Sequence, residues 1–65
     1  MTIEQYTNNP NHYEVYDSIT DAEPIAEFEI VENRLNGWQQ IHWLYGEDTV
    51  DIDTLSEINN ILYVG

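Results

Sequence analysis

Carboxylates are the groups of this sequence that could do chemistry, and several of them occur two residues apart. The acidic residues include the pairs Glu27–Glu29 and Asp51–Asp53. If each pair lies on a strand, its two side chains point the same way, about 6.7 Å apart. Phosphates along one nucleic-acid strand have a comparable spacing, since the axial rise alone is about 3.4 Å per nucleotide. A row of such carboxylates therefore predicts a surface that imitates a phosphate backbone.

A second acidic arrangement has the residue types of a calcium site and comprises Asp48, Asp51, Asp53 and Glu57. An EF-hand loop needs Gly at its sixth position and Glu at its twelfth, but counting from Asp51 gives Ser56 and Leu62 there. Favourable interaction of the carboxylates before Thr54 with a helix N-terminus is the simpler explanation. We therefore expect no metal and no cofactor.

Catalysis by acid and base would need a cleft that holds two carboxylates with separated pKa values. A chain of 65 residues can hardly bury such a cleft as a monomer. His12 is expected in a loop and His42 on a strand, and neither has a neighbouring Ser or Cys in a recognisable triad motif. The sequence is therefore predicted not to encode an enzyme, and no catalytic residue is assigned.

Net charge separates this chain from an ordinary small domain. Of its 65 residues 13 are Asp or Glu, Arg34 is the single basic residue, and the formal net charge is -12. Hydrophobic residues make up 42% of the chain, too many for a disordered acidic tail. Residues 1–65 are therefore expected to form a single small acidic domain. Solubility needs a charge of only about 2 to 8 in magnitude, and the excess costs stability through self-repulsion.

Two other origins of this acidity compete with a functional one. Ile, Asn and Tyr, which have AT-rich codons, are abundant, and this indicates mutational drift in an AT-rich genome. Lysine codons are equally AT-rich, so drift does not explain the absence of lysine. Adaptation to high salt also gives acidic, lysine-poor surfaces and stays open as an alternative.

The elements that must position the carboxylates begin with short strands. Residues 7–12 are turn formers around Pro10 and predict a loop, whereas residues 3–6 before it are too few to assign. Residues 13–17 are rich in strand formers and predict a short strand. A polar connection follows over residues 18–24.

A β-hairpin of residues 25–35 and 38–45 is the clearest expected element. Asn36-Gly37 is typical of its two-residue type I′ turn, because both central positions need positive φ. The first strand alternates, with Ala26, Phe28 and Ile30 on one face and Glu27, Glu29 and Val31 on the other. This period of two predicts a half-buried strand with one apolar face and one acidic face.

The C-terminal part is expected to form a helix. Residues 50–53 are read as a further short strand, and Thr54 with Glu57 fits a capping box that begins a helix over about residues 54–62. Residues 61–64 can alternatively form a terminal strand. The predicted fold class is α+β, a small antiparallel sheet with one C-terminal helix packed on one face.

Aromatic side chains supply most of the expected core, the candidates being Tyr6, Tyr13, Tyr16, Trp38, Trp43 and Tyr63. Strand 38–45 has apolar residues on both faces, with Ile41, Trp43 and Tyr45 on one and Trp38 and Leu44 on the other. Trp43 is expected in the core, whereas burial and exposure are equally favoured for Trp38. An exposed apolar face would mark contact with a partner or a homodimer formed through the aromatic side chains.

Composition also bounds the compartment and the partners. The N-terminus lacks the features of a signal peptide, and no apolar run approaches the ~18 residues of a membrane span. Cysteine is absent, which excludes a disulfide framework. A cytoplasmic protein is expected, in the host cytoplasm if it is phage-encoded. Nucleic acid and anionic membranes would repel this chain, so its expected partner is a basic protein.

In size and charge the chain resembles the phage-encoded DNA mimics and anti-defence proteins, although no family motif carries this resemblance. It implies an inhibitor that occupies the basic nucleic-acid-binding surface of a nuclease, a restriction or CRISPR-type effector, a repair enzyme or a nucleoid protein. The residues expected to bind this partner are Glu27, Glu29, Glu32, Asp48, Asp51 and Asp53, followed by Asp21 and Glu23. The alternative is an acidic antitoxin-like or adaptor protein that binds a basic partner outside its nucleic-acid site.

Overall fold

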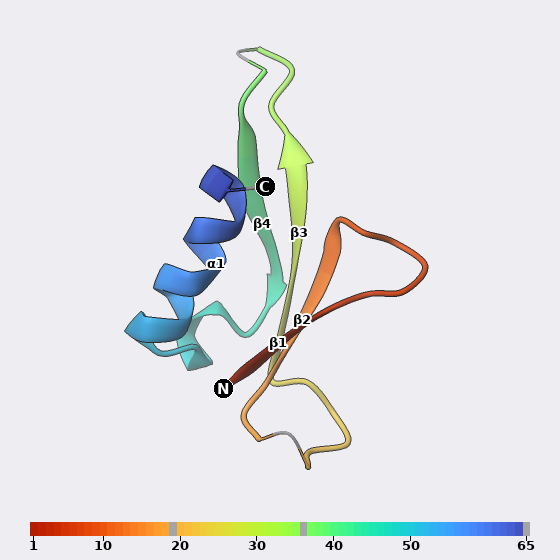
Figure 1. Cartoon of the computed structure of the whole chain (residues 1–65), viewed down its shortest axis with the longest axis vertical. Coiled ribbons are helices and arrows are strands. Elements are labelled where there is room, and N and C mark those ends of the chain that lie inside the picture. The colour runs from red at the N-terminus through yellow and green to blue at the C-terminus, as the bar shows by residue number, and fades with distance from the viewer. Residues whose placement is uncertain (19, 36, 65) are drawn as a thin grey trace.

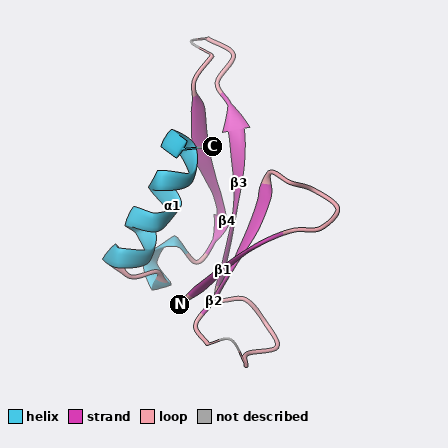
Figure 2. Cartoon of the chain, in the orientation of Figure 1, coloured by secondary structure: helices cyan, strands magenta, loops and turns pink. Residues whose placement is uncertain are grey.

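Four antiparallel strands follow one another across a single sheet, and a C-terminal helix covers one of its faces (Figures 1 and 2). The computed structural model describes the backbone of residues 1–18, 20–35 and 37–64, with helix side chains up to residue 62. In chain order the elements are β1 (Thr2–Gln5), β2 (His12–Tyr16), β3 (Ala26–Glu32), β4 (Gln39–Tyr45), the 3-10 helix η1 (Glu47–Thr49) and α1 (Ile52–Val64). This arrangement confirms the α+β fold class.

The core lies between helix α1 and the face of the sheet that carries Phe28. Residues directly opposite each other on antiparallel strands share a face, and Phe28 lies opposite Tyr13 on β2 and Trp43 on β4. Its ring stacks on Tyr13 at 5.1 Å between centroids and lies 5.2 Å from Trp43. From α1, Ile58 packs against the same buried cluster. We call this the helix-covered face, and the opposite one the open face.

The turn between β3 and β4 differs from the predicted one. A two-residue turn at Asn36-Gly37 would place Leu35 opposite Trp38, but the N–H of Asn33 donates to the Trp38 carbonyl at 2.7 Å. A four-residue loop therefore connects the strands, and the register is shifted by two residues. Gly37 has φ +73°, as a turn glycine should, whereas Asn36 lies outside the described residues.

A β-bulge on β4 overturns the predicted grouping of Tyr45 with Trp43. The register moves from Phe28 opposite Trp43 to Glu27 opposite Tyr45, which leaves Leu44 as an extra residue. This extra residue reverses the alternation, so Tyr45 lies on the open face with Glu27.

Helix α1 begins earlier than predicted. The Asp51 carboxylate accepts the N–H of Thr54 at 2.7 Å, and the Asp51 carbonyl accepts the first helical bond, from Leu55. Asp51 is therefore the N-cap, and Thr54 is the third residue of the helix instead of its cap. The predicted strand over residues 50–53 is wrong, because an Asp that caps a helix cannot also continue a strand.

Secondary structure near the two ends of the chain is left open by the sequence and is defined by the structure. Residues 61–64 belong to α1, so the helical alternative is confirmed there and the terminal strand is wrong. Residues 3–6 are too few to assign from sequence, and the first three of them belong to β1, which pairs along its length with β2. The side chain of the core candidate Tyr63 lies outside the described residues.

Candidate functional site

Three carboxylates lie directly opposite one another across three neighbouring strands of the open face. Glu4 on β1 lies opposite Glu14 on β2, and Glu14 lies opposite Glu27 on β3. Neighbouring strands are about 4.8 Å apart, so the three residues form a line perpendicular to the strands. We call this set the acidic row. Like charges placed directly opposite each other destabilise a sheet.

Glu29 extends the acidic row along β3. It is two residues from Glu27, hence about 6.7 Å further along the strand on the same face, which confirms the predicted side-by-side placement of these two carboxylates. Their side chains are 22% exposed at Glu27 and 37% exposed at Glu29. The open face therefore presents carboxylates in two directions, across the strands and along one of them.

His12 faces these carboxylates and carries a positive charge when it is protonated. It begins β2, not a loop as predicted, and its Nε2 lies 2.8 Å from Oε1 of Glu27. Its Nδ1 lies 3.5 Å from Oε1 of Glu29, and the ring of Tyr6 contacts it edge-on. The hydrogen bond to Glu27 raises the pKa of His12, opposed by partial burial and supported by Glu29.

Tyr45 and Tyr16 donate hydrogen bonds to two carboxylates of the acidic row. The hydroxyl of Tyr45 donates to Glu27, which is the main cause that lowers the pKa of Glu27, ahead of His12. The same bond raises the pKa of Tyr45 to about 12. Tyr16 donates to Glu14 at 3.2 Å. Glu27 is thus fixed by Tyr45 and His12 together, and Glu14 is oriented by Tyr16.

The β2–β3 loop adds another carboxylate beside the acidic row. A shallow cavity of about 150 Å³ is lined by Thr2, Glu4, Tyr16, Asp21 and Ala22. Asp21, one of the predicted partner-binding residues, therefore adjoins Glu4. This cavity lies between the open face, which carries Glu4 and Tyr16, and the β2–β3 loop, which carries Asp21 and Ala22.

Four of the other predicted residues lie in two segments of the chain. Glu23 lies in the β2–β3 loop, and Asp48, Asp51 and Asp53 lie in η1 and at the start of α1. These segments lie at the same end of the sheet (Figure 1). Because Asp51 caps α1 and Asp53 is inside it, they do not form the two-residue strand pair that was predicted.

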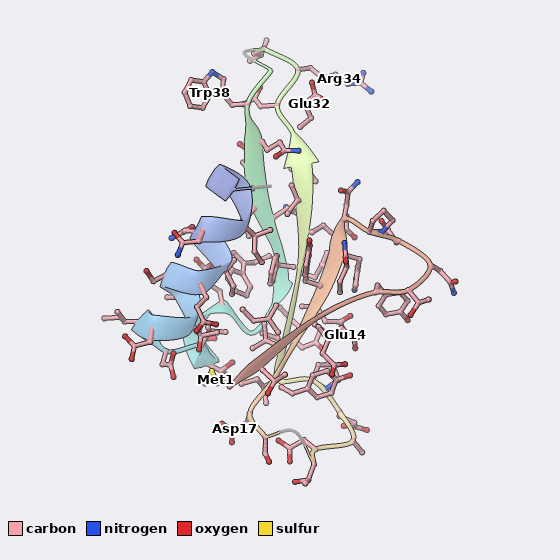
Figure 3. The ribbon with its side chains drawn as sticks, viewed as in Figure 1. Met1, Glu14, Asp17, Glu32, Arg34 and Trp38 are labelled. Carbon is pink, nitrogen blue, oxygen red and sulfur yellow. The ribbon has the colours of Figure 1, made fainter. Side chains whose placement is uncertain are left out.

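Glu32 is far from both the β2–β3 loop and the segment that joins η1 to α1. It ends β3, and Figure 3 shows it beside Arg34 and Trp38 at the hairpin tip, whereas Asp17 lies at the opposite end of the molecule. The only basic residue of the chain is therefore at the end remote from the loop carboxylates. The molecule is electrically asymmetric along its longest dimension.

Sequence reasoning missed four residues of the open-face cluster, which are Glu4, His12, Glu14 and Tyr45. The signal for Glu4 was present, because residues 3–6 precede a loop and a short strand, the pattern of a hairpin. Extending that hairpin would have placed Glu4 opposite Glu14. No local signal locates the bulge that brings Tyr45 to Glu27.

Several apolar side chains remain exposed around β4 and its hairpin. Trp38 is 70% and Leu35 96% exposed, and Leu44 is also exposed. Trp43, by contrast, packs against the core as predicted. In the part of the chain that the structure describes, no three His, Asp or Glu side chains are grouped to hold a metal ion. None of the described helices has the length and apolar character to cross a membrane.

Comparison with family models, with curated proteins and with solved structures gave no significant match to this chain. The interpretation of the open face therefore depends on its own residues.

Proposed function

We propose that this chain is a nucleic-acid mimic, an inhibitor that binds the basic surface with which a target protein holds DNA or RNA. The observation that carries the proposal is the acidic row of Glu4, Glu14 and Glu27 on the open face. The target belongs to the classes that hold nucleic acid on Arg and Lys, such as a nuclease or a restriction or CRISPR-type defence effector.

The cost of the acidic row supports a functional origin. Directly opposed like charges destabilise a sheet by about 0.2–1 kcal/mol for each pair, and a small domain has little stability in reserve. A solvated sheet face would normally intersperse lysines among its acids, but this chain has none. Interactions that lower stability and persist are typical of functional surfaces.

The spacing of the carboxylates supports a phosphate-like surface. They are about 4.8 Å apart across the strands and about 6.7 Å apart along β3, which is of the order of the repeat of a nucleic-acid backbone. Guanidinium groups that bind phosphates also bind carboxylates, because both present paired oxygens. Arginines arranged for phosphates therefore find acceptors at similar intervals on the open face.

Concentration of charge on one surface is the requirement of this mechanism. The accessible surface is 4854 Å², so a charge of -12 spread evenly would give one charge per roughly 400 Å². B-DNA carries about one charge per 110 Å², from one charge per ~1.7 Å of axis on a cylinder of about 10 Å radius. Four carboxylates on adjoining positions of the open face support a local density above this even-spread value.

The test is capture of a target followed by competition. The immobilised chain is incubated with host lysate at 0.15 M NaCl, retained proteins are identified, and each is purified. We expect a nucleic-acid-binding protein whose complex is displaced by its own DNA or RNA. A partner that binds nucleic acid and this chain at the same time would contradict mimicry and support the adaptor alternative.

A matched pair of variants separates the acidic row from total charge. Glu4→Gln with Glu14→Gln removes two carboxylates from the row, and Glu47→Gln with Glu57→Gln removes two exposed ones from elsewhere. Both variants have the same net charge. We expect the first to weaken target binding at least about tenfold and the second by less than about threefold. Equal weakening would show that net charge alone drives binding.

A further inference from the structure

We infer that the free edge of β4 is a self-association surface, on which a second copy of this chain pairs antiparallel about Ile41 to form an eight-stranded sheet. The sheet order is β1-β2-β3-β4, so β1 and β4 are its edges. This inference is independent of the proposed function, because it concerns backbone groups of β4 and uses none of the carboxylates.

The hydrogen-bond pattern identifies which residues of β4 direct their backbone N–H and C=O groups away from β3. The N–H of Asn33 donates to Trp38, so that opposed pair is a hydrogen-bonded one. Hydrogen-bonded and non-bonded pairs alternate along an antiparallel ladder. The backbone groups of Gln40 and His42 therefore form hydrogen bonds with β3. The backbone N–H and C=O groups of Gln39, Ile41 and Trp43 are directed away from β3, toward the edge of the sheet.

The neighbouring ladder agrees with this assignment. The N–H of Ile30 donates to the Asn11 carbonyl at 2.8 Å, so Ile30 points its backbone groups toward β2. Ile41 lies opposite Ile30 and is consequently in a non-bonded pair on the β3–β4 ladder. Its N–H and C=O are directed to the edge.

One two-fold arrangement uses all three outward-pointing residues. With Ile41 opposite Ile41 of the second copy, Gln39 lies opposite Trp43 and Trp43 opposite Gln39. Each of these three residues then donates and accepts one bond across the axis. Centring the pairing on Gln40 or His42 leaves one outward residue without a partner, since the bulge at Leu44 interrupts the strand.

Charge selects β4 over β1 and favours a second copy as the occupant. Among the strands of the described structure, β4 alone carries no carboxylate, whereas the short β1 carries Glu4. Long edge strands are usually protected by charges or Pro, and β4 has neither. The closest strands with carboxylates, β3 of each copy, would be three strand spacings apart, about 14 Å.

That separation makes the association depend on salt in a defined direction. About 14 Å exceeds the Debye length of about 8 Å at 0.15 M salt but is well within the 30 Å at 0.01 M. Repulsion between two chains of charge -12 is therefore screened at physiological salt and strong at low salt. Binding to a basic strand of another protein would show the opposite dependence.

The test compares mass and amide protection across salt concentrations. Analytical ultracentrifugation should show twice the 7.6 kDa monomer at 0.15 M NaCl and the monomer at 0.01 M. Hydrogen exchange at Ile41 should slow at least about tenfold in the dimer, while the amides of Gln40 and His42 are protected in both states. A monomer at 0.15 and 0.5 M NaCl up to millimolar concentration, with a fast-exchanging Ile41 amide, would overturn the inference.

Backbone N-methylation gives a matched pair of variants, prepared by chemical synthesis. N-methyl-Ile41 blocks the β4 edge without touching the β3 ladder, and N-methyl-Ile3 blocks the β1 edge in the same way. We expect the first to be a monomer and the second to remain a dimer, with circular dichroism confirming that both fold. A dimer lost only in the Ile3 variant would assign association to β1. Protection of Ile41 only on adding a different protein would assign the β4 edge to that protein.

Discussion

Nε2 of His12 lies 2.8 Å from Oε1 of Glu27, although the residue directly opposite His12 on β3 is Glu29. The contact is therefore a diagonal one, between neighbouring strands of the open face. It places His12 between two carboxylates and couples its protonation to the charge of the acidic row.

The stability of the fold should pass through a maximum in mildly acidic solution because of this contact. Glu27 raises the pKa of His12 above 6.5, so the stabilisation from His12 is complete below pH 6.5 and is lost as the pH rises through the raised value. Tyr45 and His12 lower the pKa of Glu27 below 4.5, so its stabilisation is present above pH 4.5 and is lost as the pH falls through the lowered value.

Urea unfolding across pH checks this expectation. His12→Gln should flatten the decline in unfolding free energy between pH 6 and 8, because it removes the titrating group. His42→Gln is the control, because it also removes one histidine but keeps the contact between His12 and Glu27, and the decline should therefore persist. An identical slope for all three proteins would mean that the contact contributes nothing to stability.

Removing the hydroxyl of Tyr45 should raise the pKa of Glu27. The hydroxyl is the principal donor to this carboxylate, so Tyr45→Phe leaves only His12 to stabilise the ionised form. Carboxyl chemical shifts followed by NMR during an acid titration measure the change. Tyr6→Phe, which keeps the ring against His12, should not alter the Glu27 titration. In the native protein one tyrosine should ionise only near pH 12.

Neutralising the centre of the acidic row should stabilise the sheet. Glu14 faces like charges on both sides, at Glu4 and Glu27, so Glu14→Gln should increase the unfolding free energy by about 0.2–1 kcal/mol. Urea denaturation measures the difference. Glu57→Gln, on the exposed side of α1, removes the same charge without an opposed partner and should have a smaller effect. A destabilised Glu14→Gln would show that the row is not under repulsion.

Loss of the helix cap should destabilise the protein more than loss of a nearby charge. The Thr54 hydroxyl, followed by its N–H, lowers the pKa of Asp51, which reflects two bonds to one carboxylate. Asp51→Ala removes both bonds, whereas Asp53→Ala removes only a charge in the first turn. We expect a clearly lower melting temperature for the first variant by calorimetry and a small change for the second.

Added salt should raise the melting temperature. With a net charge of -12 and a single basic residue, most interactions between charges are repulsive, and a shorter Debye length weakens them. Calorimetry from 0.01 to 0.3 M NaCl should show a continuous rise. Choline chloride, which provides the same ionic strength, should reproduce it, whereas a rise in NaCl alone would indicate binding of sodium ions instead of screening.

Patterning carried by the β3 strand was predictable from sequence because it is local. The alternation of Phe28 with Glu27 and Glu29 fixes one apolar face and one acidic face, and Leu55 with Ile58 indicates the helix. These features specify the fold class without knowledge of any long-range contact.

What sequence could not supply was register. Tyr45 reaches Glu27 only through the bulge at Leu44, and His12 reaches it only because β2 pairs with β3 in one particular alignment. The glycine at position 37 correctly predicts a hairpin but not its register, because a glycine with positive φ fits a four-residue loop as well as a two-residue one. The sequence predicts Asp51 as a strand residue because polar and apolar residues alternate around this helix cap as they do in a short strand.

The order of the strands has a consequence for how the chain assembles. Each strand is hydrogen-bonded to the one that precedes it in the chain, with no crossover between them. Loop closure is therefore short at every step, which is the topology of rapid folding. The hydrophobic core nevertheless includes Ile58 of α1, so the complete fold forms only once this last element is present.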